Sequence, residues 1–232
     1  MITMKTTFLS FIFLLSAIYI KAQDQDLTKF LDDYRITKEI HNEAGGTIHS
    51  YDNIEGSPYL YPDYREATIF MDKGLRYHGN LRYDLYSGEM EFQLKGKRYW
   101  IAPKEKIEKI ILDDKTFLFL TTGKDKKGSF YELITDGPCR LLAKYTVDFI
   151  DAEEAKPYQD PRPARFSRKK TLYYIQKEGE EPLFIRNKKN LLSALGDKSS
   201  EIASFIRKEH LSVTRKEDLS RIISHYNELL RQ

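Results

Sequence analysis

Between Leu75 and Leu94, apolar and polar side chains alternate with a period of two residues. One parity carries Leu75, Tyr77, Leu81, Tyr83 and Leu85, and the other carries Arg76, His78, Asn80, Arg82 and Asp84. Such alternation is typical of a strand with one buried and one solvent-exposed face. After Ser87-Gly88 the alternation resumes at Met90, Phe92 and Leu94. The stretch is therefore predicted to form a long β-hairpin.

The dipeptide Ser87-Gly88 predicts a two-residue turn for this hairpin. That turn pairs Leu85 with Met90, Tyr83 with Phe92 and Leu81 with Leu94, all on the apolar face. Turn and alternation thus indicate one register. Gly79 lies inside the first strand, where a glycine allows a sheet to bend.

On the polar face this register sets Asp84 opposite Glu91. Two carboxylates at that distance can hold calcium or share a proton. Arg82 lies diagonally from Glu91 and can neutralise it. We therefore expect an ordinary charged outer face rather than a site.

The remaining pattern predicts further strands and a helical C-terminus. Strands are expected at residues 65–71, 98–102, 116–121, 130–134, 140–150, 170–176 and 183–186, and helices at 27–34 and in three segments after 187. Thr214 to Glu217 reads as a capping box for the last helix. The predicted fold class is α+β: a curled antiparallel sheet of about seven to nine strands in meander order, as a roll or open barrel, with C-terminal helices packed on it.

The domain organisation follows from the same pattern. Residues 1–22 are predicted to be a signal peptide, and 23–150 to hold the N-terminal helix, a loop and the antiparallel meander. Residues 151–168 form a proline-containing strap. Residues 169–232 add a hairpin and the C-terminal helices to the same globular unit.

The signal peptide is predicted from a basic Lys5 followed by an apolar run at residues 8–20. Ile20-Lys21-Ala22 offers a cleavage site before Gln23. The run is short for a spanning helix, which favours a cleaved leader over an uncleaved anchor. We therefore expect an exported protein, periplasmic or extracellular, with no transmembrane segment in the mature chain.

Composition narrows the function classes. The 16 tyrosines and 13 phenylalanines favour β structure. The net charge is only +3, and Lys5 and Lys21 of the leader account for two of these charges. Such a balance gives no broad positive field, so we expect no nucleic-acid partner. The single cysteine, Cys139, excludes an internal disulfide, and its apolar flank favours a buried residue over a nucleophile.

No motif in the sequence predicts catalysis. None of the five histidines stands four residues from another, and we predict no metal site and no cofactor. The spacing of serine, histidine and aspartate predicts no triad, and there is no phosphate-binding glycine loop. The sequence therefore favours a non-enzymatic protein over an enzyme.

The segment around Pro58 and Pro62 holds the one candidate contact surface. Tyr59, Tyr61 and Tyr64 lie close together outside any clean strand pattern, and Arg65, at the start of the next predicted strand, adds a charge that can select an anionic group. Tyrosines on a rigid loop are frequent contacts for sugars, peptides or proteins. The alternative is that the loop packs onto the sheet as a plug.

Four segments together resemble an uncharacterised family of exported proteins common in Bacteroidetes: GSPYLYPDYREATIF, LRYDLYSGEMEF, DPRPARFSRKKTLYYI and the tail from LLSALGDK onward. The resemblance implies an envelope-associated protein and supplies no activity.

From pattern and resemblance we expect a non-enzymatic binding or interaction module whose partner is an envelope protein, a glycan or an apolar ligand. The alternatives are a periplasmic carrier that holds an apolar ligand between sheet and helices, and an unrecognised hydrolase.

We predict that the exported protein begins near Gln23, because cleavage after Ala22 removes the apolar run. Intact-mass measurement of the secreted product checks this. Recovery of the chain with residues 1–22 attached would contradict it.

Overall fold

The computed structural model describes residues 24–34, 38–39, 51, 54–123, 125–155 and 160–231. The expected signal peptide, residues 1–22, lies outside the described residues. Within them, twelve strands join one sheet. Eleven follow a single antiparallel path: β14 (Leu183–Phe184), β13 (Leu172–Lys177), β10 (Cys139–Lys144), β9 (Ser129–Thr135), β8 (Lys115–Leu120), β7 (Ile107–Leu112), β3 (Arg65–Met71), β4 (Arg76–Asp84), β5 (Glu89–Leu94), β6 (Lys97–Trp100) and β2 (Lys38–Glu39).

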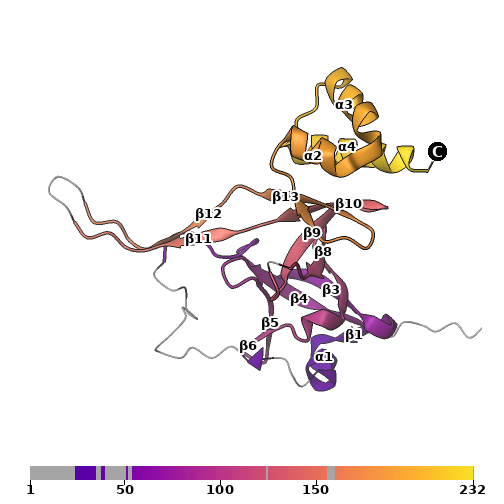
Figure 1. Cartoon of the computed structure of the whole chain (residues 1–232). Coiled ribbons are helices and arrows are strands. Elements are labelled where there is room, and N and C mark those ends of the chain that lie inside the picture. The colour runs from indigo at the N-terminus through magenta and orange to yellow at the C-terminus, as the bar shows by residue number, and fades with distance from the viewer. Residues whose placement is uncertain are drawn as a thin grey trace, which may run out of the picture.

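The predicted α+β class is confirmed. A short strand, β1 (Asp24–Asp26), pairs in parallel with β4, and the two ends of the antiparallel path, β14 and β2, do not pair with each other. The sheet is therefore open rather than closed into a barrel. The C-terminal helices pack on the part of the sheet formed by β9 and β10 (Figure 1).

The strand order departs from a simple meander where β13 adjoins β10, where β2 adjoins β6 and where β7 adjoins β3. β7 pairs with β3 and not with β6, its predecessor in the chain. Beside β3, the buried Ile110 and Leu112 continue the apolar face that carries Ile69. Beside β6 they would adjoin a strand whose residues are all exposed or only partly buried. Burial of this apolar face thus favours the crossover.

The hairpin register differs from the prediction by two residues. Tyr83 pairs with Met90 and Asp84 with Glu89, so residues 85–88 form the loop. The Asp84 carboxylate accepts hydrogen bonds from the backbone N–H groups of Tyr86 and Ser87, at 2.9 and 3.1 Å. These bonds favour the longer turn. A shift of two preserves parity, and the apolar face is therefore as predicted.

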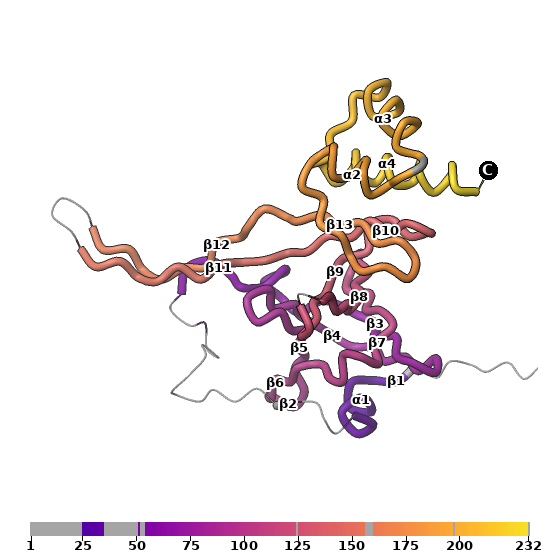
Figure 2. Tube along the Cα trace, viewed as in Figure 1, coloured from indigo at the N-terminus to yellow at the C-terminus, as the bar shows by residue number. Residues whose placement is uncertain are grey.

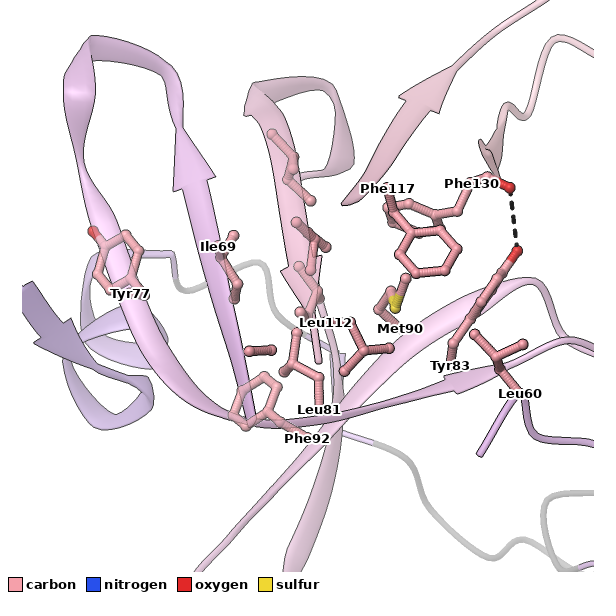
Figure 3. Close-up of a cluster of buried hydrophobic side chains, with 14 of the residues drawn as sticks. Leu60, Ile69, Tyr77, Leu81, Tyr83, Met90, Phe92, Leu112, Phe117 and Phe130 are labelled. Atoms are coloured by element: carbon pink, nitrogen blue, oxygen red, sulfur yellow. Dashed lines mark hydrogen bonds between the residues drawn. The ribbon is translucent and has the colours of Figure 1, made fainter. Parts of the chain in front are cut away.

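The curled strands β3–β9 enclose the first hydrophobic core, here called the N-terminal core (Figure 3). Its fully buried residues include Ile69, Tyr77, Leu81, Met90, Phe92, Ile110, Leu112 and Phe117. The helix α1 (Leu27–Asp33) closes one end through Phe30, which contacts the rings of Tyr77 and Phe92. A Cβ on Gly79 would lie 2.4 Å from Leu27 Cδ1. Gly79 is thus required for the close approach of α1.

The second core, here called the helix core, lies between β10 and β13 and the helices α2 (Lys188–Leu195), α3 (Ser199–Lys208) and α4 (Lys216–Leu229). In Figure 1 these helices stand together above β10 and β13. Asn227 of α4 fixes the helix to the sheet, since its side chain donates to the Cys139 carbonyl and accepts from the Cys139 N–H, both at 2.9 Å. Helix and strand are therefore joined by hydrogen bonds as well as by apolar contacts.

The predicted capping box of α4 does not form. The helix begins at Lys216 after Arg215, which makes no side-chain capping bond. The Thr214 hydroxyl pairs with that of Ser212 instead. Asp218 in the first turn accepts a hydrogen bond from the Ser212 N–H at 2.9 Å. The loop before the helix is thus held by Asp218.

The strands β11 (Val147–Ile150) and β12 (Arg165–Arg168) form a separate two-stranded ribbon. Figure 2 shows this ribbon projecting from the body of the protein. Phe166 anchors its base, because its ring is buried against Tyr51 and Tyr86. The proline-containing strap of residues 151–168 therefore includes the returning half of this ribbon.

Glu132 joins the two cores. It is a buried residue of β9 and forms ion pairs with Lys115 of β8 at 3.1 Å and with Lys216 of α4 at 2.7 Å. The Tyr145 hydroxyl donates to the same carboxylate. Burial alone would raise the pKa of Glu132, but the hydrogen bonds from Lys216, Tyr145 and Lys115 hold that pKa below its ordinary value. The contact between the two cores at Glu132 therefore requires the ionised carboxylate.

We predict that Glu132→Gln lowers the free energy of unfolding at pH 7 by about 2 kcal/mol, since it leaves two lysines without their shared partner. The pKa of Glu132 is lower in the folded than in the unfolded chain. The difference in the free energy of unfolding between wild type and Glu132→Gln is therefore complete above the ordinary pKa of glutamate. It is lost as the pH falls through the folded pKa. Denaturant unfolding across this pH range measures the difference.

Glu209→Gln is the matched control, because Glu209 pairs with Arg221 at the surface. We expect it to change the free energy of unfolding by less than about 0.5 kcal/mol. A Glu132→Gln loss that stays constant from neutral to strongly acidic pH would contradict the assigned role of the charge.

Candidate functional site

The segment that carries Tyr59, Tyr61 and Tyr64, here called the tyrosine loop, lies on the polar face of β4 and β5. Tyr59 is only 8% exposed, and the Arg82 guanidinium lies 3.6 Å from the centre of its ring. The Tyr64 ring lies 4.5 Å from the same guanidinium. Arg82 is therefore held between two of the predicted contact residues, an arrangement in which cation–π attraction is strong because the charge is removed from water.

The loop buries two carboxylates that were expected at the surface. Glu91 is 2% exposed and accepts hydrogen bonds from Arg82 and from the Tyr64 hydroxyl. Asp84 is 3% exposed and accepts from the Tyr51 hydroxyl at 2.6 Å. The expectation of an ordinary charged outer face is therefore wrong here. Each carboxylate has hydrogen-bond donors in place of the water that burial removes.

The outer part of the tyrosine loop is more open. Tyr61 and Tyr64 are partly buried, and Arg65 is exposed at the start of β3. The Tyr61 hydroxyl donates to Asp114 at 3.3 Å, and the Arg65 guanidinium lies 5.4 Å from the Tyr61 ring. Burial raises the pKa of Tyr64 to about 12. Tyr59 thus occupies a plug position, whereas partner contact through Tyr61 and Arg65 stays a prediction.

A groove of about 660 Å³ lies elsewhere, where β9, β10, β13 and β14 meet two loops. We call it the Tyr131 groove. Its lining comprises Thr122, Gly123, Asp125, Tyr131, Lys144, Tyr174, Glu181, Pro182, Leu183, Phe184, Arg186 and Asn190. On β10 and β13, Lys144 and Tyr174 have the opposite parity to Leu141 and Ile175, which belong to the helix core. The groove therefore opens on the face of the sheet that points away from the helices.

Three aromatic rings follow one another across the groove. The rings of Tyr131 and Tyr174 meet edge to face at 5.2 Å, and those of Tyr174 and Phe184 lie 5.4 Å apart. Tyr174 and Phe184 are direct cross-strand partners, which sets their side chains on the same face. Both are partly exposed. They thus present a ring surface to a ligand.

Both carboxylates that line the groove already have donors. Asp125 accepts from the Ser129 hydroxyl at 2.7 Å and lies 3.5 Å from the Lys144 ammonium. The Ser129 hydrogen bond comes first among the causes that lower the pKa of Asp125. Glu181 accepts from the Gly123 N–H at 3.0 Å and so ties the two rims of the groove together. These acids hold the groove in shape.

Two polar groups of the groove have no partner among the described residues. Tyr131 is 2% exposed as a whole residue and lines the groove, and its hydroxyl makes no hydrogen bond within that part of the chain; burial raises its pKa to about 12. The guanidinium of Arg186 likewise makes no ion pair there. A neutral phenol and a permanent cation are thus available to a bound molecule.

Sequence reasoning did not find these residues. The strands that carry Tyr131 and Tyr174 were predicted, but their alternation does not say which face the helices cover. Phe184 lies on the second strand of the β13–β14 hairpin, and Arg186 follows that strand. The other residues that line the groove come from segments that are distant in the sequence. The signal in the sequence is limited to aromatic residues at alternating strand positions.

Other candidate chemistry is absent from the described part of the chain. There, no group of three or more histidine, cysteine, aspartate or glutamate side chains is placed to hold a metal ion. Cys139 is fully buried, and burial raises the pKa of its thiol to about 11. Such a thiol is a poor nucleophile at neutral pH. Among these residues we also find no helix with the length and hydropathy to cross a membrane.

We predict that Tyr59→Ala lowers the free energy of unfolding by about 3 kcal/mol, because it removes a buried ring and leaves Arg82 without one of its two aromatic partners. Tyr61→Ala is the matched control and should cost about 1 kcal/mol or less, since its ring is partly exposed. Chemical denaturation of both variants measures this. Equal losses in the two variants would contradict the plug role of Tyr59.

Comparison with known proteins yields no relative. No protein-family model matches the chain, and neither a curated protein nor a solved structure is similar to it. The resemblance to exported proteins of Bacteroidetes therefore stays a prediction, and the function is inferred from the geometry and chemistry of the residues themselves.

Proposed function

We propose that the chain is an exported, non-enzymatic binding protein of the cell envelope and that the Tyr131 groove holds its ligand. The observation that carries this is the row of aromatic rings across the groove, where the Tyr131 hydroxyl makes no hydrogen bond with the described residues. A phenol hydroxyl that is not used within the protein can donate a hydrogen bond to a bound molecule and accept one from it. The volume of about 660 Å³ also falls within the range of about 300–1,000 Å³ that is usual for small-ligand sites.

The charged groups of the groove favour binding over catalysis. Asp125 is held by Ser129 and Lys144, and its lowered pKa keeps it ionised at neutral pH. A general acid or base works best when its pKa lies near the working pH. Glu181 is likewise occupied by the Gly123 N–H. The groove is thus supplied with fixed contacts rather than with groups ready to transfer protons.

The space between sheet and helices offers less support for a carrier of apolar ligands. Leu191, Leu195, Ile202, Leu219, Ile222 and Ile223 all point into the helix core and are fully buried there. Close-packed side chains of this kind leave no room for a second apolar molecule. A ligand in the Tyr131 groove, by contrast, displaces only water.

Export is proposed on sequence alone, from Lys5 and the apolar run at residues 8–20. An envelope location exposes a binding protein to glycans, peptides and small metabolites. Most of these molecules are polar and dissolved in water, so the proposed function requires a groove that can bind a polar molecule.

The test is a thermal-shift screen of the purified mature chain against defined sugars, amino acids, short peptides and fatty acids. A ligand at about one hundred times its Kd adds about 2.7 kcal/mol, which raises the Tm of a chain of this size by roughly 5–10 °C. We expect at least one compound to shift the wild type and to lose its effect on Phe184→Ala. Phe184 is a suitable site because it lies on the edge strand.

Tyr86→Ala serves as the control, since Tyr86 is also a partly exposed aromatic residue and lies at the base of the ribbon. It should respond to the same compounds as the wild type. A screen in which every active compound shifts Phe184→Ala as much as the wild type would remove the groove as the binding site.

A further inference from the structure

We infer that the ligand of the Tyr131 groove is a saccharide that carries a carboxylate, with its ring on Tyr174 and Phe184 and its carboxylate on Arg186. This inference rests on the proposed function, because it assigns a ligand class to the same groove. It follows from the groups of the groove that have no hydrogen-bond or ion-pair partner among the described residues.

The carboxylate of the proposed ligand is inferred from the charged side chains that line the groove. Among the described residues, four charged side chains line the groove, and Lys144, Asp125 and Glu181 are all engaged within the protein. In the described part of the chain, the Arg186 guanidinium has no carboxylate partner. Guanidinium binds a carboxylate through two parallel hydrogen bonds, so a free arginine at a groove selects this group.

The net charge of the four groups is zero, since two cations and two carboxylates line the groove. The groove therefore attracts an anion at short range, through Arg186, and not through a broad positive field. This favours one carboxylate on an otherwise neutral molecule over a polyanion such as nucleic acid.

The saccharide part follows from the rings and the free hydroxyl. Tyr174 and Phe184 present adjacent, partly exposed ring surfaces. An aromatic face accepts the C–H side of a pyranose, while the sugar hydroxyls remain free for hydrogen bonds. The hydroxyls of Tyr131 and Tyr174 lie in the same lining, make no hydrogen bond with the described residues and can supply such bonds. A pyranose, which has an apolar C–H face and hydroxyls around its edge, matches this combination.

Other ligand classes match the groove less well. A peptide that added a strand to the sheet would pair with β14, which spans only Leu183–Phe184 and offers little backbone. A fatty acid would cover Lys144 and Asp125 with its apolar chain and so remove charged groups from water without compensation. A saccharide avoids both costs.

The experiment is a calorimetric titration of the mature chain with oligosaccharides that contain uronic, neuraminic or muramic acids. Each is measured beside its methyl ester, which keeps the ring and removes the charge. We expect binding of at least one acid and a loss of about tenfold or more in affinity for its ester. A short peptide set and a fatty-acid set are titrated in parallel.

Three variants locate the contacts. Arg186→Gln should bring acid and ester to equal affinity, and Arg186→Lys should restore part of the preference, because it returns the charge without the two-pronged geometry. Phe184→Ala should weaken acid and ester alike. Lys189→Gln is the control for net charge, since Lys189 is exposed on α2 outside the groove lining, and it should leave the preference unchanged.

Each outcome decides one of the two proposals. Equal binding of acid and ester by the wild type, or binding of peptides or fatty acids alone, overturns the acidic saccharide and leaves the groove as a binding site. An acid preference that survives in Arg186→Gln overturns the assignment of Arg186. Failure of every compound in this titration and in the thermal-shift screen overturns the binding function itself.

Discussion

The ion pairs of Glu132 with Lys115 and Lys216 stand at the border between the two hydrophobic cores. On the same strand, Phe130 belongs to the N-terminal core and Ile134 packs against the helix core. A buried carboxylate is costly unless donors surround it, and Lys216 of α4 supplies one of them. The helices are therefore held over one defined face of the sheet, and the position of the groove depends on that choice of face.

Because α4 packs on the side of β10 that carries Leu141, the opposite side of β10 and β13 stays outside the helix core. Tyr174 lies on that opposite side, and the neighbouring edge strand adds Phe184. Two loops then close the rims of the groove through the contact between Glu181 and Gly123. The groove is thus the consequence of covering a two-faced sheet with helices on one face only.

The tyrosine loop covers charged side chains on the polar face of β4 and β5. Arg82, Glu91 and Asp84 are charged residues at positions that the fold covers. Their burial is tolerated because Tyr59 and Tyr64 stack on the guanidinium and because Tyr51 and Tyr64 donate to the carboxylates. Arg168 of the ribbon donates to the carbonyls of Tyr59 and Leu60 and so secures the loop from outside. The aromatic richness of the chain is thus partly explained by the need to cover charge.

The sequence alone determined most of the elements and their faces, but not β7 or the division of residues 140–150 between β10 and β11 in two sheets. The alternation from Leu75 to Leu94 predicts the hairpin and its buried side, and both survive a register shift of two because parity is unchanged. Helical spacing likewise predicts α2, α3 and α4, whose stripes become the helix core. Local periodicity fixes these features because it depends only on which side chains avoid water.

Only the tertiary structure decided what lies against each face. The pairing of β7 with β3, the burial of Asp84 and Glu91, and the meeting of Tyr131, Tyr174 and Phe184 all join segments that are distant in the chain. Alternation marks a residue as inward or outward but does not identify its neighbour. The neighbours are chosen by the packing of the whole sheet and by the hydrogen bonds that buried polar groups require, so the candidate groove emerged only from the folded chain.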